Sequence, residues 1–491
     1  MPLPDLIEIV PLTQPVRADI TVPGSKSITN RALVLAALAD GETTLQGALW
    51  SEDTQVMVDC LQELGFMVNV EQDANESCNR TITVYGQGGQ VPRGGSEAQP
   101  LELFVGNAGT AARFLAAMVC LGEGVYRLHG VPRMHERPQS ALFQALRQLG
   151  FRVESEQGND KLPVRIWGGR SSSFARSAGN LSPKYQELLT GDKMPSCKVS
   201  ISESSQFASA LLLCAKVGCW KIELIGENAD ESPYVMMTSK LIEAFSNHGG
   251  TFQIEPDASS GSYFWAAGKW VDAAERMEYS EQFGVEVATQ DLTPISVKCW
   301  PATGWQIDAR FPDVLFESFA LHLGLGRHHS SRQMPADPRL VRTLESPSIS
   351  RQNDLGDSIM TAVVLAPFSL KPVFFTDLGR LRVQECERVV ALRTELTKCG
   401  AKVIETGDTL EVFPSALHGA EIETYNDHRM AMCFAILGLK IPGIKIKNPA
   451  CVKKTFPNFF QKLAAAPPHG LGATILDASG RPLTHDELFA D

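Results

Sequence analysis

The sequence predicts a mixed α/β protein with two domains, and two observations lead to this fold class. The chain has 491 residues, too many for one ordinary hydrophobic core, and 44% of them are hydrophobic. One pattern, a small polar turn followed by an apolar helix and a strand, occurs three times before about residue 248 and three times after it. Two domains of similar construction account for both observations.

The six copies of this pattern follow one another along the chain. Each opens on small or polar residues, continues at helical spacing and, except in the fourth copy, closes on a β-rich stretch. The copies are GSKSITNRALVLAALADGETTLQG at 24–47, GNAGTAARFLAAMVCLGEGVYRLHG at 106–130, SSQFASALLLCAKVGCWKIELIG at 204–226, DASSGSYFWAAGKW at 257–270, DLGDSIMTAVVLAPFSLKPVFFTDL at 354–378 and NDHRMAMCFAILGLKIPGIKIKNP at 426–449. We therefore expect six helix N-termini to converge on one cleft.

The first copy combines the features of an anion site. Ser25 and Ser27 stand at the helix opening, where backbone N–H groups lack partners and the helix dipole is positive, and Lys26 adds a mobile ammonium. Ordinary capping is the alternative: Ser25 or Thr29 would cap the helix, and Lys26 and Arg31 would lie on a solvated face. The charged residues at the other helix openings help to decide between an anion site and ordinary capping.

The net charge limits the classes of molecule that the protein could bind, and the cysteine content indicates its cellular compartment. A net charge of −11 argues against a nucleic-acid or anionic-membrane surface, so a cationic site would be local and would suit small anionic ligands. The 11 cysteines are scattered without metal-binding spacing, as in a reduced cytosolic protein. The first residues do not resemble a signal peptide, and no apolar run is long enough to span a bilayer. We expect a cytoplasmic protein without a metal site.

Charged side chains gather near the predicted helix openings. Arginine suits bidentate binding of carboxylate or phosphate and lysine supplies a point charge, so these residues imply ligands with two anionic groups. Asp357 and Glu385 are the candidates for acid–base chemistry, although each, taken singly, is more often a solvated surface carboxylate. The cations are Lys26, Arg31, Arg113, Arg137, Arg388, Arg429 and Lys454.

Eight longer stretches, taken in order, cover about residues 8–463: PGSKSITNRALVLAALADG, GNAGTAARFL, RMHERP, SSQFASALLL, DASSGSYF, RVQECERVVALRTEL, YNDHRMAMCFA and KTFPNFF. In these motifs the chain resembles the 3-phosphoshikimate 1-carboxyvinyltransferase family, also called enolpyruvylshikimate-phosphate synthases. The resemblance implies a two-domain inverse α/β barrel, in which each domain has three βαβαββ repeats and the helices converge on an interdomain cleft. It implies a first domain of residues 1–22 and 249–465, a second of 23–248, and a C-terminal tail of 466–491.

The resemblance also implies an activity, the transfer of the enolpyruvyl group of phosphoenolpyruvate to a hydroxyl of shikimate 3-phosphate. The reaction proceeds by addition and elimination, releases phosphate and needs no cofactor. Asp357 would accept the hydroxyl proton, and Glu385 with Lys26 would deliver and later remove the methylene proton. Phosphoenolpyruvate would be bound by Lys26, Asn107, Gly109, Arg137, Gln206, Arg388, Arg429 and Lys454. The acceptor would be bound by Lys26, Ser27, Arg31, Ser204, Ser205, Gln206, Tyr234, Asp357, Arg380 and Gln384.

Three positions depart from the family pattern where it binds the acceptor's phosphate. Glu231 stands in place of a serine, Arg380 in place of an asparagine, and Gln384 in place of a lysine. A carboxylate beside a phosphate is repulsive unless Arg380 pairs with it. Two alternatives therefore stay open: a specialised relative with a different cyclic acceptor that need not be phosphorylated, and a binding paralogue without catalysis. For each of them we expect a monomer that binds small anions.

Overall fold

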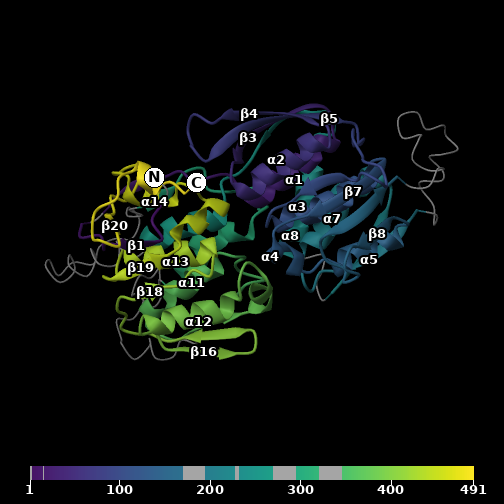
Figure 1. Cartoon of the computed structure of the whole chain (residues 1–491). Helices are drawn as coiled ribbons and strands as arrows, with labels where there is room; N and C mark the ends of the chain where they lie inside the picture. The colour runs from purple at the N-terminus through teal and green to yellow at the C-terminus, as the bar shows by residue number, and fades with distance from the viewer. Residues whose placement is uncertain are drawn as a thin grey trace, which may run out of the picture. The chain divides into compact units, whose positions relative to one another are not determined.

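The computed structural model describes residues 3–14, 16–169, 194–226, 232–268, 295–319 and 346–490. The chain folds into two compact units: unit 1 is Met1–Val22 with Pro256–Asp491, and unit 2 is Pro23–Glu255 (Figure 1). Unit 2 is thus one uninterrupted stretch inserted into unit 1. It extends beyond the expected boundary at residue 248, because β12 (Gly250–Gln253) pairs with β3 (Asp40–Leu49).

The described strands of unit 2 form three sheets with a common arrangement. Their strand orders are β12–β3–β5 (Asn79–Gln87)–β4 (Met67–Gln72), β6 (Leu101–Phe104)–β7 (Gly124–His129)–β9 (Val164–Gly168)–β8 (Arg152–Ser155), and β10 (Ser196–Ser200)–β11 (Lys221–Ile225). Each sheet contains one parallel pair: β12 with β3, β6 with β7, and β10 with β11. In the two larger sheets, antiparallel strands extend that pair.

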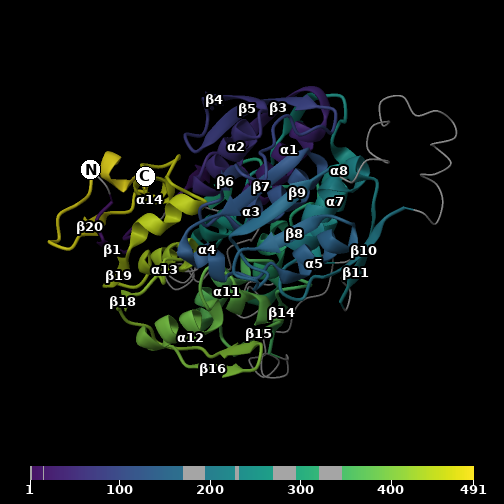
Figure 2. The same ribbon diagram turned by 45° about the vertical axis from the view of Figure 1, so that its right-hand side comes forward.

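Three helices that open copies of the sequence pattern pack against one another inside unit 2: α1 (Lys26–Leu38), α3 (Gly109–Met118) and α7 (Gln206–Gly218). All 10 residues of α3 are buried; most of them are apolar, and Thr110 and Arg113 are the polar exceptions. The other helices are α2 (Glu52–Glu63), α4 (Pro132–Glu136), α5 (Ser140–Gln148) and α8 (Pro233–Ala244), with the 3-10 helix η1 (Val119–Leu121). Of these, α5 lies against β8 and β10 (Figure 2).

The described strands of unit 1 also form three sheets. Their strand orders are β18 (Glu421–Ile422)–β19 (Ile444–Lys447)–β1 (Leu6–Ile9)–β20 (Ile475–Asp477), β14 (Ser348–Ser350)–β15 (Val373–Thr376)–β17 (Thr409–Val412)–β16 (Val403–Thr406), and β13 (Ile295–Val297)–β2 (Ala18–Ile20). Each sheet again contains one parallel pair: β18 with β19, β14 with β15, and β13 with β2. The two units are therefore built from similar sheets.

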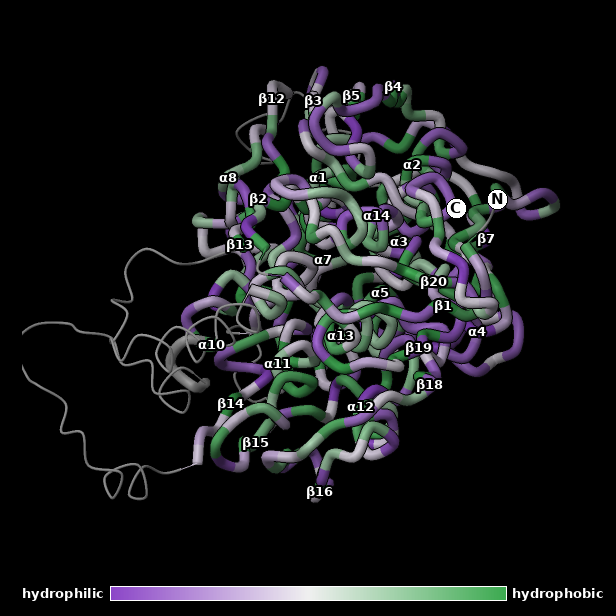
Figure 3. The backbone as a smooth tube through the Cα atoms, turned by 90° about the vertical axis from the view of Figure 1, so that its left-hand side faces the viewer, coloured by the Kyte–Doolittle hydropathy of each residue, from purple (hydrophilic) through white to green (hydrophobic). Residues whose placement is uncertain are grey.

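Helices from the last three copies of the sequence pattern contribute to the core of unit 1. They are residues 258–268, α11 (Ile359–Leu365) and α13 (His428–Gly438). Every residue of α11 and α13 is buried, and their traces are largely apolar in Figure 3. The other helices are α10 (Phe311–Phe319), α12 (Arg388–Lys398) and α14 (Phe459–Ala464), with the 3-10 helices η2 (Ile307–Arg310), η5 (Ala366–Phe368), η6 (Leu378–Val383), η7 (Pro449–Lys454) and η8 (Asp486–Leu488). No helix in the described residues is both long and apolar enough to cross a bilayer.

The last residues of the chain, expected to form a tail from residue 466, pack into unit 1 as far as residue 490. The strand β20 pairs with β1 in antiparallel register, and Arg481 binds both carboxylate oxygens of Glu487 at 3.1 and 3.0 Å. A strand of three residues is too short to show a readable alternation, so the sequence pattern did not reveal it.

Candidate active site

The N-terminal ends of α3 and α7 lie side by side in unit 2. Gln206, the first residue of α7, donates from Nε2 to Thr110 Oγ1 on α3 at 3.1 Å. Arg113 on α3 donates from Nη1 to Gln206 Oε1 at 3.2 Å. Its Nε donates to Gln139 Oε1 at 3.1 Å. Two helix dipoles therefore present their positive ends at one place, beside a buried arginine.

Arg31 links α1 to the same group of helix ends. It is 2% exposed; its Nε donates to Thr238 Oγ1 on α8 at 2.8 Å, and its Nη2 donates to Ser209 Oγ on α7 at 3.1 Å. The guanidinium carbon lies 5.2 Å from the ring centroid of Phe114. Burial lowers the pKa of Arg31 to about 10, so the side chain is still charged at neutral pH. Arg31 thus holds three helices together and keeps a positive charge among their N-termini.

Two further cations of unit 2 are Lys26, which begins α1, and Arg137, the C-cap residue of α4, whose guanidinium lies at the start of α3. Lys26 Nζ lies 3.1 Å from Oδ2 of Asp53, a residue of α2 whose side chain is almost fully buried. Arg137 Nη1 donates to the carbonyl of Asn107 at 3.1 Å. Arg137 Nε and Asn107 Oδ1 are buried and make no hydrogen bond to any described residue. Buried polar atoms usually have partners, so a ligand here could supply missing hydrogen bonds.

Gly109 allows two arginines to approach the start of α3. A Cβ at this position would lie 2.3 Å from Arg113 Nη1 and 2.7 Å from Arg137 Nη2. Both distances are shorter than a non-bonded contact allows, so only glycine fits without displacing a guanidinium. We call the cations and amides at these helix ends of unit 2 the unit 2 cluster; its members are Lys26, Arg31, Asn107, Arg113, Arg137 and Gln206.

The residues predicted to bind the acceptor lie in part on the same helix ends. Ser204 Oγ accepts the N–H of the first residue of α7 at 3.2 Å, and Ser205 is the N-cap residue of that helix. Tyr234 lies in the first turn of α8, and Ser27 lies in the first turn of α1. Glu231 falls outside the described residues. The openings of α1, α7 and α8 thus carry the predicted acceptor residues of unit 2.

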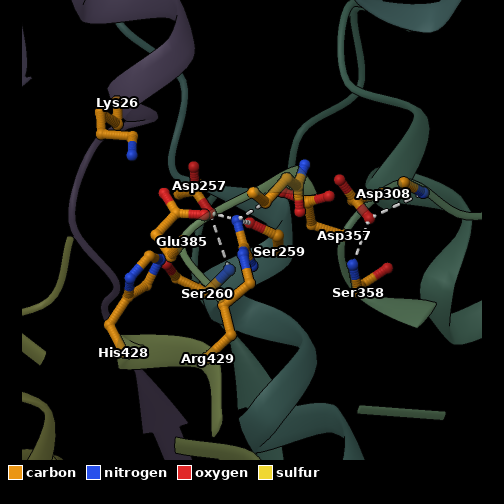
Figure 4. Close-up of polar contacts among 12 residues, drawn as sticks. Lys26, Asp257, Ser259, Ser260, Asp308, Asp357, Ser358, Glu385, His428 and Arg429 are labelled. Atoms are coloured by element: carbon orange, nitrogen blue, oxygen red, sulfur yellow. Dashed lines mark hydrogen bonds and ion pairs between the residues drawn. The ribbon is translucent and has the colours of Figure 1, made fainter. Parts of the chain in front are cut away.

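Unit 1 brings four helix ends together in a similar manner. Arg429, in the first turn of α13, donates from Nη2 to Ser259 Oγ at 3.0 Å (Figure 4). The same nitrogen lies 3.3 Å from Asp357 Oδ2, just before α11. Arg388, which begins α12, binds the α13 N-cap residue Asp427 through Nε at 2.7 Å and Nη2 at 3.2 Å. The helix that carries Ser259 and the helices α11, α12 and α13 therefore start within one polar cluster.

The Arg388–Asp427 pair lies at the centre of this cluster. The two residues are 1% and 0% exposed. Arg388 Nη2 also lies 2.9 Å from Glu385 Oε2, and its Nη1 donates to Gln384 Oε1. Burial disfavours the charge of Arg388, but the nearby carboxylates, Asp427 foremost, raise its pKa above the usual range. Arg388 is therefore a firmly held, permanently charged guanidinium.

Asp357 lies among three arginines. Arg351 Nη2 donates to Asp357 Oδ1 at 2.8 Å. Arg429 Nη2 and Arg388 Nη1 lie 3.3 and 3.8 Å from its Oδ2. Burial alone would raise the pKa of Asp357, but the charges of the three arginines hold it well below its usual range. Asp357 is therefore ionised throughout the physiological pH range.

Asp308 supports the segment that carries Asp357. Its Oδ1 accepts the backbone N–H of Gly356 at 3.0 Å and that of Ser358 at 2.8 Å (Figure 4). Burial and, after it, the negative charge of Asp357 raise the pKa of Asp308. The neighbouring carboxylates thus have pKa values shifted in opposite directions, and Asp308 fixes the backbone at the start of α11.

Glu385 lies between two cations. Its Oε2 is 2.9 Å from Arg388 Nη2, and its Oε1 is 3.4 Å from Lys454 Nζ. The side chains of Glu385 and Lys454 are 13% and 10% exposed, so both are shielded from most of the solvent. Arg380, in η6, is half-buried. We call this group the unit 1 cluster; its members are Ser259, Arg351, Asp357, Glu385, Arg388, Asp427, Arg429 and Lys454.

Most of the site residues that the sequence did not reveal are hydrogen-bond or ion-pair partners of the predicted residues. Asp53 is 27 positions from Lys26, and Asp427, to which no role was assigned, is 39 positions from Arg388. Pairing across such separations leaves no local pattern. Ser259, by contrast, lies in the small polar opening of the fourth copy, DASSGSYF, and could have been found there. Among the described residues, no three His, Cys, Asp or Glu side chains are grouped so as to hold a metal ion.

Comparison with known proteins covers nearly the whole chain. A family model described as EPSP synthase (3-phosphoshikimate 1-carboxyvinyltransferase) matches residues 10–273 and 337–463, which contain every member of both clusters. The 3-phosphoshikimate 1-carboxyvinyltransferase of Trichormus variabilis is 35% identical over 478 residues, covering 93% of this chain and 98% of that protein. Its counterpart in Opitutus terrae is 36% identical over 493 residues, covering 94% and 98%. The structure of EPSP synthase from Acinetobacter baumannii has a mixed α/β fold similar to that of this chain, with a TM-score of 0.61 at 18% identity, covering 96% of this chain and 100% of that one.

Proposed function

This chain belongs to the EPSP synthase (3-phosphoshikimate 1-carboxyvinyltransferase) family, and we propose on that premise that it transfers the enolpyruvyl group of phosphoenolpyruvate to a hydroxyl of shikimate 3-phosphate and releases phosphate. One structural observation carries the proposal: each unit gathers helix N-termini and buried cations into one cluster. Both proposed substrates are anions, and such clusters offer N–H donors and positive charge.

Phosphoenolpyruvate, in this proposal, is bound through its two anionic groups. Its carboxylate is bound by Arg388 and Arg429, which lie within 3.8 and 3.3 Å of the same Asp357 oxygen. The unsatisfied Arg137 Nε supports a role for that residue in binding the phosphate. The proposed partners of the phosphate are Lys26, Asn107, Gly109, Arg137, Gln206 and Lys454.

The acceptor is proposed to be shikimate 3-phosphate. A different acceptor is not favoured, because the relatives at 35% and 36% identity both bear the name of the enzyme that uses this substrate. Arg380 can supply positive charge in place of the lysine that Gln384 replaces. The proposed acceptor residues are Lys26, Ser27, Arg31, Ser204, Ser205, Gln206, Tyr234, Asp357, Arg380 and Gln384.

The proposed reaction is an addition followed by an elimination. Asp357 accepts the proton of the acceptor hydroxyl as its oxygen bonds to C2 of phosphoenolpyruvate, and Glu385 with Lys26 delivers a proton to the methylene carbon, C3. The same pair then removes a proton from C3 while the bond between C2 and the phosphate oxygen breaks. The products are the enol ether and free phosphate. Positioning and neutralisation of charge are the main contributions that these steps need.

The surroundings of Asp357 make its basicity depend on the substrate. Although burial acts in the opposite direction, the surrounding arginines hold the pKa of Asp357 well below its usual range, which makes it a weak base. A substrate carboxylate on Arg429 and Arg388 would offset their charge and raise that pKa. The acid limb of kcat should therefore lie at higher pH than the acid limb of kcat/KM. Coincident limbs, or limbs in the opposite order, would contradict Asp357 as the base.

The finer architecture is part of the same proposal. We infer three βαβαββ repeats in each unit, arranged as an inverse α/β barrel with helices that converge on a cleft between the units. The parallel strand pairs of each unit support this inference. We further propose a cytoplasmic monomer whose units close on the substrates. Small-angle scattering should show compaction with both substrates and a monomeric mass; an unchanged profile or a dimeric mass would contradict the respective inference.

Phosphate release tests the proposed activity. The purified chain is incubated with phosphoenolpyruvate and shikimate 3-phosphate, each substrate is omitted in turn, and the enol ether is sought by mass spectrometry. Release that requires both substrates, with the enol ether formed, supports the proposal. Activity only with an unphosphorylated cyclic acceptor would identify the specialised relative instead. Binding of phosphoenolpyruvate without turnover of any acceptor would identify a binding paralogue.

A further inference from the structure

The loop that leads into α13 has an unusual backbone. Tyr425 and Asn426 both have a φ of +54°, in the left-handed region that asparagine tolerates and tyrosine seldom adopts. Directly after them, Asp427 caps α13, and Arg429 lies in the first turn of that helix. Such a backbone persists where surrounding contacts hold it. The contacts that hold this loop in place therefore also help to determine the position of Arg429.

Glu395 on α12 provides such an anchor. Its side chain is 0% exposed. Tyr425 Oη donates to Glu395 Oε1 at 2.8 Å, and the backbone N–H of Glu423 donates to Oε2 at 3.1 Å. Lys398 Nζ donates to both oxygens at 2.9 and 2.8 Å. A carboxylate accepts from all three donors. An amide could still hold the loop, with its oxygen on the Glu423 N–H and its N–H2 group on the Tyr425 hydroxyl, which can accept as well as donate, so an apolar replacement is needed to release the loop.

The helix α12 is therefore attached to the loop at two points. At its first residue, Arg388 binds Asp427 through two hydrogen bonds. About two turns further along α12, Glu395 binds the loop at Glu423 and Tyr425. Two attachments fix both the distance and the orientation of one segment relative to the other, which a single ion pair cannot do.

We propose that Glu395 is a positioning residue for phosphoenolpyruvate: by anchoring the loop to α12, it fixes Arg429 relative to Arg388. This inference rests on the proposed function, in which these two arginines bind the substrate carboxylate. Glu395 acts through them, since its own carboxylate is fully buried against the loop. Its loss should weaken the binding of phosphoenolpyruvate more than that of the acceptor.

The kinetic test compares Glu395→Met with Lys398→Met. The Glu395→Met variant keeps the approximate length of the side chain but offers the loop no oxygen acceptor, so the KM for phosphoenolpyruvate should rise by roughly tenfold or more, with the KM for the acceptor within about twofold. Lys398→Met removes the third donor to the same carboxylate without touching the loop, so both KM values should change by less than about twofold. Equal effects of the two variants, or equal changes in the two KM values, would overturn the proposal.

A second readout does not depend on activity. In Glu395→Met, backbone amides of residues 423–430 should exchange hydrogen faster than in the unaltered chain, and in Lys398→Met they should not. If Glu395→Met does not fold, Tyr425→Phe, which removes one donor from an exposed ring, decides the question by a smaller change of the same kind. Unchanged exchange and unchanged KM would reject the positioning role. An unaltered chain that releases no phosphate while exchange responds as expected would reject only the proposed function.

Discussion

Replacing Asp427 by asparagine should destabilise unit 1 while leaving the shape of the side chain nearly unchanged. The amide oxygen can still accept the Arg429 N–H, which donates to Asp427 Oδ1 at 2.9 Å, so the cap of α13 survives. The substitution removes the negative charge that faces Arg388 at 2.7 and 3.2 Å and turns an N–H2 group toward guanidinium donors. It therefore tests the ion pair separately from the cap.

The size of the effect follows from the burial of the pair. Removing one partner of a buried ion pair costs about 3–5 kcal/mol, because the other charge stays buried. Arg388 keeps Glu385 Oε2 at 2.9 Å, so we expect the lower end, about 3 kcal/mol. In a domain of this size each kcal/mol lowers the Tm by roughly 2–4 °C, which gives a fall of about 6–12 °C.

Calorimetry on the whole chain provides the measurement, and Asp257→Asn provides the matched control. Asp257 accepts the backbone N–H of Ser260 at 2.7 Å at the start of its helix, as Asp427 does for α13, and no ion pair to Asp257 is among those identified in the described residues. The control should cost less than about 1 kcal/mol, because asparagine caps as well as aspartate. Equal stability losses in the two variants would refute the reasoning that the buried Arg388–Asp427 pair is the source.

Three other predictions concern the clusters. Arg429→Ala should keep the Tm of unit 1 within a few degrees but lower kcat/KM at least about tenfold, because one charge-assisted contact is lost; kinetics equal to those of the unaltered chain would contradict its assignment. Gly109→Ala should raise the KM for phosphoenolpyruvate, because the new Cβ would lie 2.3 Å from Arg113 Nη1 and 2.7 Å from Arg137 Nη2 and displace them. An unchanged KM in a variant that folds normally would show that the two arginines can move without loss of substrate binding. The folded-state pKa of Asp357 lies below the ordinary aspartate value of 3.8, so its ionised form stabilises the fold above that pH and the contribution is lost as the pH falls toward the folded-state pKa. The Tm of the unaltered chain should therefore fall more steeply than that of Asp357→Asn below about pH 4, and parallel Tm profiles would argue against the shift.

The sequence allowed much of the local structure to be predicted, because each copy of the pattern carries its own helix signal. The helix expected from GSKSITNRALVLAAL begins at Lys26 and ends at Leu38, and the sixth copy gives α13. Ion pairs between residues far apart in the sequence could not be predicted, because nothing near Arg388 in the sequence indicates that Asp427 would neutralise it. The tail expectation missed β20 for a related reason: a strand of three residues is defined by its partner β1, which lies at the other end of the chain.

The sheet that joins both chain ends in unit 1 has a consequence for the order of folding during synthesis. The strand β1 leaves the ribosome before the other described strands, yet its two neighbours, β19 and β20, begin at Ile444 and Ile475. Unit 2 is complete once residue 255 has emerged, so it can fold while its host is still unfinished. One face of Leu6–Ile9 is apolar, and it stays uncovered until residues 475–477 have been made. A nascent chain stalled before residue 444 should therefore expose this segment to chaperones, and one in which residues 444–477 have emerged and paired with it should not.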